Sequence, residues 1–217
     1  MHWPCDTNRP GPIWVPLRSS PGTVEVIGTY TWLGIEHILT GADHLLFVLA
    51  LVLIVRSRRQ LLITITAFTI AHSITLALAT LNLVRIPGPP VEATIALSIV
   101  FVASEIVRLR RGREGLAARK PWVIAFAFGL LHGLGFAGAL AEIGLPQNAI
   151  PLALLFFNVG VEIGQLMFVV AVLAAAAIAH RLIRRHTEPR WTKVMLAYLI
   201  GSVASFWVFE RIAAFWS

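Results

Sequence analysis

The chain has 217 residues, of which 57% are hydrophobic and only 13% are charged, and its mean hydropathy is +0.78. A soluble domain carries about 25% charged residues, so the composition excludes an ordinary soluble protein. The net charge of +7 resides mainly in short basic segments between apolar runs, a pattern typical of membrane proteins, and we expect no nucleic-acid partner. The single cysteine, Cys5, excludes an internal disulfide and a thiolate metal cluster.

Residues 1–30 are polar and contain five prolines, without helical or strand periodicity. They are predicted to form a flexible, extracytoplasmic N-terminal tail. Six apolar runs follow, each of about 20 residues or more, the length that spans a bilayer as a helix. We therefore predict an all-α integral membrane protein, in which residues 31–217 form a bundle of about six transmembrane helices in the lipid bilayer. The predicted spans are residues 31–55, 60–81, 91–109, 121–143, 149–180 and 191–215.

The orientation follows from the distribution of basic residues. Of the 18 Lys and Arg residues, 14 lie in the segments after the first, third and fifth spans. Basic loops stay in the cytoplasm, so both termini are predicted to be extracytoplasmic.

Several histidines lie inside the spans, where an ionisable group costs roughly 2.5–3.5 kcal/mol on insertion scales. At 1.5 Å per residue, His44, His72 and His132 lie about 13, 12 and 11 residues into their spans, close to the midplane. Glu162 lies at a similar depth. His37 lies about six residues into the first span, nearly two turns from His44 on the same face of one continuous helix.

Imidazole nitrogens combined with carboxylate oxygens suit divalent Zn, Ni or Co. The leading hypothesis is an intramembrane metal site formed by His44, His72 and His132, with Asp43 and His37 as further candidate ligands. His37 is either an outer ligand or the point at which an ion gains access. For any single histidine, an interhelical hydrogen bond is the alternative interpretation.

Other polar residues are candidate supports for the metal ligands. Asn158, Glu162 and Gln165 follow an i, i+4, i+7 pattern and form one polar stripe on the helix. The stripe either orients the imidazoles or only stabilises helix packing. Ser73, next to His72, is a further candidate. In the third span Ser98 and Glu105 share a face, and Glu105 is either functional or paired with Arg108. Glycines around His132 allow close helix approach or local unwinding.

Four sequence blocks resemble the HupE/UreJ family of membrane proteins, particularly its second branch. They are HILTGADHLLF at residues 37–47, AHSITL at 71–76, FGLLHGLGFA at 128–137 and FNVGVEIGQ at 157–165. The resemblance covers about residues 30–215. It implies a multi-pass protein of the bacterial cytoplasmic (inner) membrane, hydrogenase or urease accessory roles, and secondary transport of nickel or cobalt.

Three functions remain open. A nickel or cobalt permease would bind the ion through neutral imidazoles, so binding should weaken as pH falls towards about 6.5. An intramembrane zinc hydrolase would use Asp43 or Glu162 as general base and Ser73 to stabilise an oxyanion. Haem ligation by His72 and His132 is the third. Assembly into a homo-oligomer is also open.

Overall fold

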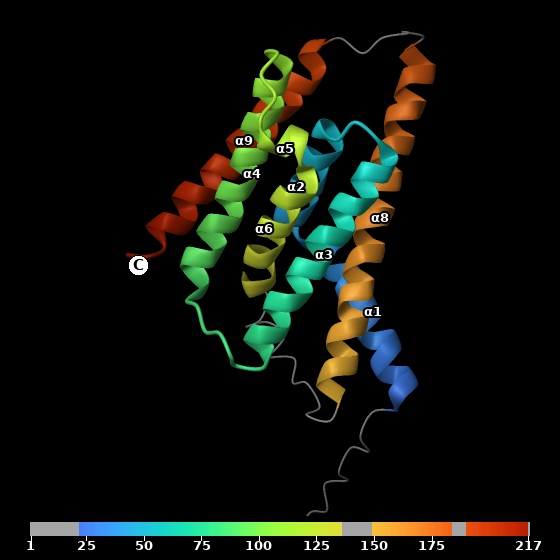
Figure 1. Ribbon diagram of the computed structural model, residues 1–217, viewed down its shortest axis with the longest axis vertical. Coiled ribbons are helices and arrows are strands. Elements are labelled where there is room, and N and C mark those ends of the chain that lie inside the picture. The colour runs from blue at the N-terminus through green and yellow to red at the C-terminus, as the bar shows by residue number, and fades with distance from the viewer. Residues whose placement is uncertain (1–21, 136–148, 184–189, 217) are drawn as a thin grey trace, which may run out of the picture.

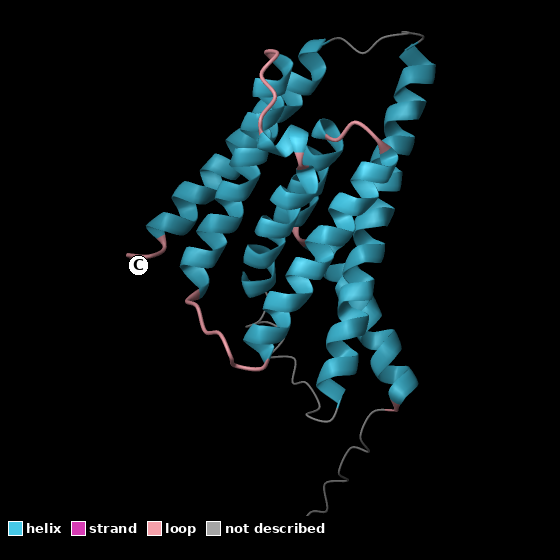
Figure 2. Cartoon of the chain, in the orientation of Figure 1, coloured by secondary structure: helices cyan, strands magenta, loops and turns pink. Residues whose placement is uncertain are grey.

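The computed structural model describes residues 22–135, 149–183 and 190–216. The described part of the chain is entirely helical, without a β-strand (Figure 2), as the sequence predicted. The helices are α1 (Thr23–Thr40), α2 (Ala42–Ile54), α3 (Arg58–Thr80), α4 (Gly88–Arg110), α5 (Leu116–Arg119), α6 (Pro121–Gly135), α8 (Ile150–Ile183) and α9 (Arg190–Ala213). Residues 23–30, expected in the tail, are helical, and residues 1–21 of the tail lie outside the described residues.

Four of these helices (α3, α4, α8 and α9) are long and apolar enough to cross a membrane. The bent pair α1 and α2 raises the number of candidate spans to five if it counts as one. Helix α6 is apolar but shorter, and the rest of the predicted fourth span lies outside the described residues. The chain is therefore a multi-pass helical membrane protein, while a total of six spans remains a prediction.

The helices pack in three main pairs, α3 with α6, α1 with α8 and α4 with α9. The short helix α2 lies in the middle of the bundle and contacts α1, α3, α4, α8 and α9 (Figure 1). Its Phe47 packs into a buried cluster with Phe68 of α3 and Ile99 of α4. This central position surrounds the polar N-terminal end of α2 with protein rather than lipid.

Close helix approach depends on glycine at two of these pairs. A Cβ atom at Gly34 of α1 would collide with the Phe157 carbonyl of α8, and one at Gly133 of α6 would collide with the His72 carbonyl of α3. Small residues allow such approach between membrane helices. The close-approach interpretation of the glycines around His132 is confirmed, and α6 remains helical through His132 without unwinding.

The loops after α2 and α4, both predicted to be cytoplasmic, lie at the same end of the bundle. An ion pair joins Arg56 of the first loop to Glu114 of the second, with 2.6 Å between Nη2 and Oε1. Nearby, Glu105 is 2% exposed, lies 3.2 Å from Arg108 and accepts a hydrogen bond from the Ala117 N–H at 3.1 Å. The ion-pair interpretation of Glu105 is therefore confirmed.

Candidate metal centre

The predicted first span is broken at Gly41. Helices α1 and α2 meet there at an angle of 73°, so the prediction of one continuous helix was wrong. The Gly41 N–H still donates to the His37 carbonyl at 3.0 Å, but the Gly41 ψ of 96° ends α1. A Cβ atom at Gly41 would lie 2.8 Å from the His37 carbonyl oxygen and 2.9 Å from Nδ1 of His44. The bend therefore needs a residue without a side chain.

The break brings His37 to the other histidines, whereas a straight helix would hold it nearly two turns from His44. The ring centroids of His37 and His44 lie 4.6 Å apart, and the His72 ring lies 6.0 Å from His37 and 6.2 Å from His44. Each of these three residues offers a ligand atom, and the three atoms lie within 4.8 Å of one another. The cluster of His37, His44 and His72, hereafter the histidine cluster, could therefore hold a metal ion.

His44 is oriented by the residue before it. Asp43 Oδ1 lies 3.1 Å from His44 Nδ1 and also accepts the His44 backbone N–H at 2.9 Å. A carboxylate can only accept, so Nδ1 carries the ring proton and Nε2 presents its lone pair. His44 is 5% exposed, and its Nε2 has no hydrogen-bond partner among the residues that the structure describes. A carboxylate holding the far nitrogen is the usual arrangement behind a metal-bound histidine.

His72 is oriented in the same way from another helix. Asn158 of α8 donates its amide to the Leu154 carbonyl at 2.8 Å, which turns its Oδ1 towards His72 Nδ1 at 3.1 Å. The amide oxygen accepts, so Nδ1 of His72 is the donor and Nε2 holds the lone pair. His72 is fully buried, and in the described part of the chain its Nε2 has no hydrogen-bond partner.

His132 lies beside the histidine cluster rather than in it. Its ring centroid is 4.8 Å from that of His44, but the group of ligand atoms includes His37 in its place. Its Nε2 lies 3.4 Å from Oγ of Ser98, whose hydroxyl proton is already donated to the Ile95 carbonyl at 2.6 Å. The serine oxygen therefore accepts, and the partnerless Nδ1 of His132 is the nitrogen with the lone pair.

Three imidazoles of this region thus share one unusual property. Nε2 of His44, Nε2 of His72 and Nδ1 of His132 are buried, and none of the residues that the structure describes gives them a hydrogen-bond partner. A buried polar atom left unsatisfied costs about 1–3 kcal/mol. Partners fix the opposite nitrogen of every ring, so the arrangement suits a ligand that accepts lone pairs, and a metal cation has that property.

The remaining predicted residues contact other groups. Ser73 donates its hydroxyl to the Thr69 carbonyl at 2.6 Å, and Thr69 in turn donates to Gln165 at 3.1 Å. Glu162 accepts a hydrogen bond from Thr66 at 2.7 Å. Thr66 is six residues from His72, about 9 Å along the axis of α3. Of Ser73, Asn158, Glu162 and Gln165, Asn158 alone is hydrogen-bonded to an imidazole of the region, and Ser98 of the third predicted span contacts His132.

A cavity of about 280 Å³ adjoins the histidine cluster. Two of the residues that line it, Glu92 of α4 and Arg211 of α9, received no functional role from the sequence. Arg211 lies 3.6 Å from Asp43 and 3.9 Å from Glu92. One signal was present, since an arginine inside a predicted span is a candidate functional residue. The lining residues are His37, Gly41, Asp43, His44, Glu92, Ile95, His132, Gly135 and Arg211.

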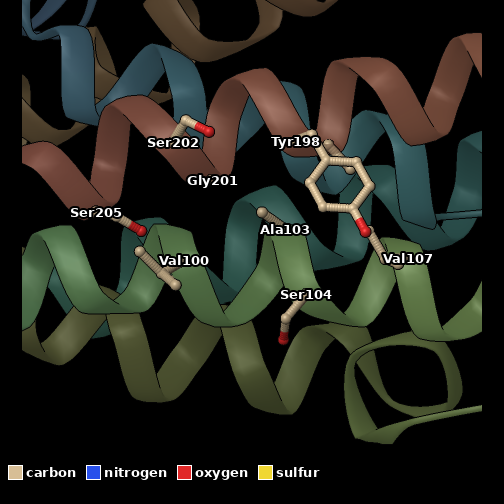
Figure 3. Close-up of a pocket in the computed structure, with 9 residues that line it drawn as sticks. Val100, Ala103, Ser104, Val107, Tyr198, Gly201, Ser202 and Ser205 are labelled. Atoms are coloured by element: carbon tan, nitrogen blue, oxygen red, sulfur yellow. The ribbon is translucent and has the colours of Figure 1, made fainter.

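A second cavity of about 460 Å³ lies between α4 and α9 (Figure 3). Among its described lining residues, the polar side-chain groups are serine and tyrosine hydroxyls, including those of Ser104, Tyr198 and Ser202. These residues include no imidazole and no carboxylate, the usual protein ligands of a divalent metal ion. The smaller cavity is the one lined by imidazoles and carboxylates.

Comparison with known proteins gives one match. A family model described as HupE / UreJ protein matches residues 17–211, which is most of the chain and includes every histidine described above. The chain belongs to the HupE/UreJ family. No curated protein and no solved structure matches it. The family membership agrees with the resemblance of the four sequence blocks.

Proposed function

We propose that this HupE/UreJ family member is a permease for a divalent metal ion, nickel or cobalt, and that the histidine cluster binds the ion in transit. The observation that carries the proposal is the convergence of the imidazoles of His37, His44 and His72. Nε2 of both His44 and His72 is buried and has no hydrogen-bond partner among the described residues. Neutral imidazole is a good ligand for both metals. Asp43 and Asn158 hold two of the rings from behind, and His132 provides a further nitrogen at the edge of the cluster.

The surroundings of the histidine cluster differ between its two sides. On one side the cavity with Asp43 and Glu92 adjoins the cluster. On the other side, polar pairs Thr69–Gln165 and Thr66–Glu162 continue along the contact of α3 and α8. Beyond them, Leu61, Ile65, Val48 and Val169 form a buried apolar cluster. A central site that opens to one side and is closed on the other fits a transporter that alternates access.

Metal uptake by the purified protein in liposomes tests the proposal. Vesicles with the wild-type protein should accumulate nickel or cobalt above empty vesicles, and H44A and H72A should abolish the uptake. H180A, which removes a histidine near the end of α8, is the control and should retain it. Uptake should fall when the outside pH is made strongly acidic, because protonated imidazole has no lone pair to donate. Absence of uptake of nickel, cobalt and zinc at every pH would refute transport.

A zinc-dependent hydrolase is the second candidate, because a cavity lies directly beside the histidines and Asp43. The positions of the other supposed catalytic groups disfavour it, since Ser73 bonds to a backbone carbonyl and Glu162 to Thr66. Elemental analysis separates the two. Stoichiometric zinc that survives dialysis against a chelator would favour the hydrolase, and a weakly held, exchangeable metal favours the permease.

A further inference from the structure

The cavity beside the histidine cluster contains a charged assembly from three helices. Arg211 of α9 donates from Nη1 to the Glu92 backbone carbonyl at 2.7 Å, and its other nitrogens face the carboxylates of Glu92 and Asp43 at 3.9 and 3.6 Å. The other oxygen of Asp43 holds His44. One carboxylate therefore connects the guanidinium directly to the histidine cluster.

Burial and an aromatic contact hold the Arg211 side chain in this position. Its side chain is only 22% exposed, and its guanidinium carbon lies 5.7 Å from the centre of the Trp207 ring. A guanidinium remains charged at any ordinary pH. The positive charge therefore sits permanently among groups that would otherwise attract a cation.

The same cavity contains unpartnered ligand atoms. His132, 1% exposed, and His44 both line it, and each has one nitrogen that forms no hydrogen bond with a described residue. Two carboxylates at the rim and imidazole lone pairs behind them form a set of donors that a divalent cation would occupy in sequence. Among the described residues that line the cavity, Arg211 is the one Lys or Arg, and it lies at the carboxylate end.

We propose that Arg211 is the gate of this cavity: its guanidinium occupies, as an internal counter-ion, the Asp43 and Glu92 carboxylates that first receive the entering divalent cation. The inference rests on the proposed function. An arriving divalent ion displaces the singly charged guanidinium from the two carboxylates and then passes to the imidazoles. Because both cations compete for the same carboxylates, the arginine lowers the affinity of the resting site and prevents the ion from being held too tightly to leave.

Nickel titration of the purified full-length protein, followed by calorimetry, tests the gate. R211Q should bind nickel about tenfold more tightly than the wild type, because removal of a neighbouring positive charge relieves repulsion of a divalent ion. R211K, which retains the charge, should stay close to the wild type. R85Q is the matched control, since it removes an equal charge from the exposed loop before α4, and should leave the affinity unchanged.

Each outcome decides a separate point. If the wild type binds nickel and R211Q binds it equally or more weakly, Arg211 is only a packing residue and the gate is refuted, while the metal site stands. An equal tightening in R211K would also refute the gate, because charge would not be the cause. If neither the wild type nor R211Q binds nickel or cobalt, the gate and the proposed function fall together. Adding E92Q to R211Q should remove part of the gained affinity, and failure to do so would contradict the role of Glu92.

Discussion

Two regions of this bundle bury polar side chains, and they do so in opposite ways. At the end with the basic loops, Glu105 is buried but paired, with Arg108 on one side and the Ala117 N–H on the other. In the histidine cluster, His44 and His72 are similarly buried, yet each has one ring nitrogen without a partner in the described part of the chain. The two regions therefore differ in whether the buried polar atoms are satisfied, and not in the degree of burial.

The difference has an energetic reason. A buried polar atom without a partner costs about 1–3 kcal/mol, and a protein gains nothing from such a cost unless another species satisfies the atom. Glu105 anchors the short helix α5 against α4 and needs no ligand to do so. The imidazoles are oriented by Asp43 and Asn158 so that their free lone pairs remain available, which a purely structural hydrogen-bond network would not require.

Substitution of the cluster histidines should cause the largest change in nickel affinity. H44A or H72A removes one of the three converging ligands, and we expect nickel affinity to fall on the order of 100-fold. H180A, outside the cluster, should have no effect. Calorimetric titration measures the change, and unchanged affinity in both cluster variants would mean that the metal binds elsewhere.

Asn158 tests whether the orientation of a ring matters. N158A leaves His72 in place but removes the oxygen that accepts from its Nδ1. Loss of such a supporting residue typically costs 10–100-fold in metal affinity. Gln165 is the matched control on the same stripe, since it bonds to Thr69 instead. Equal losses in N158A and Q165A would indicate a general packing defect rather than loss of orientation.

Gly41 tests whether the break in the first span assembles the site. In G41A the new methyl group would lie within 3 Å of the His37 carbonyl and of His44 Nδ1, so one of them must move. We expect nickel affinity to fall about tenfold, a loss of about 1.4 kcal/mol. G28A is a suitable control, because nothing lies within 4 Å of its added Cβ atom. Retained affinity in G41A would show that the bend tolerates a side chain.

Substitution of Glu105 should have the smallest effect on nickel affinity, but it should lower the stability of the fold. E105Q weakens the ion pair with Arg108 and the bond to Ala117, and we expect a stability loss of about 1–3 kcal/mol. Nickel affinity should remain within about twofold of the wild type, well under the 1.4 kcal/mol of a tenfold change. Thermal unfolding in detergent and nickel titration on the same sample measure both. A large loss of affinity without loss of stability would reverse the assignment of the two regions.

Much of the fold follows from local sequence properties. Apolar runs of membrane length predicted the long helices, and the predicted fourth span begins at residue 121, where α6 begins. Depth counting brought His44, His72 and His132 to one region, because rise per residue is nearly constant in a helix. The sequence analysis did not predict the break at Gly41, because hydropathy does not reveal a bend within an apolar run. His37 was consequently placed two turns from the neighbour it contacts.

The rim of the site depends on tertiary structure alone. Glu92 and Arg211 are 119 residues apart in the chain and meet only because α4 packs against α9. No spacing or periodicity in the sequence connects them. Arg211 therefore entered only the prediction of membrane topology, and Glu92 was assigned no function. Similarly, the partner of Glu162 depends on the register between α3 and α8, which helix periodicity does not determine.

The central claim is that imidazole nitrogens of the histidine cluster hold the metal, and X-ray absorption spectroscopy of the nickel-loaded protein tests it most directly. We predict a first shell of nitrogen and oxygen at about 2.0–2.1 Å, with the outer-shell scattering of two or three imidazole rings that weakens in H72A. A spectrum of nickel surrounded by oxygen alone, identical in the wild type and H72A, would contradict the account.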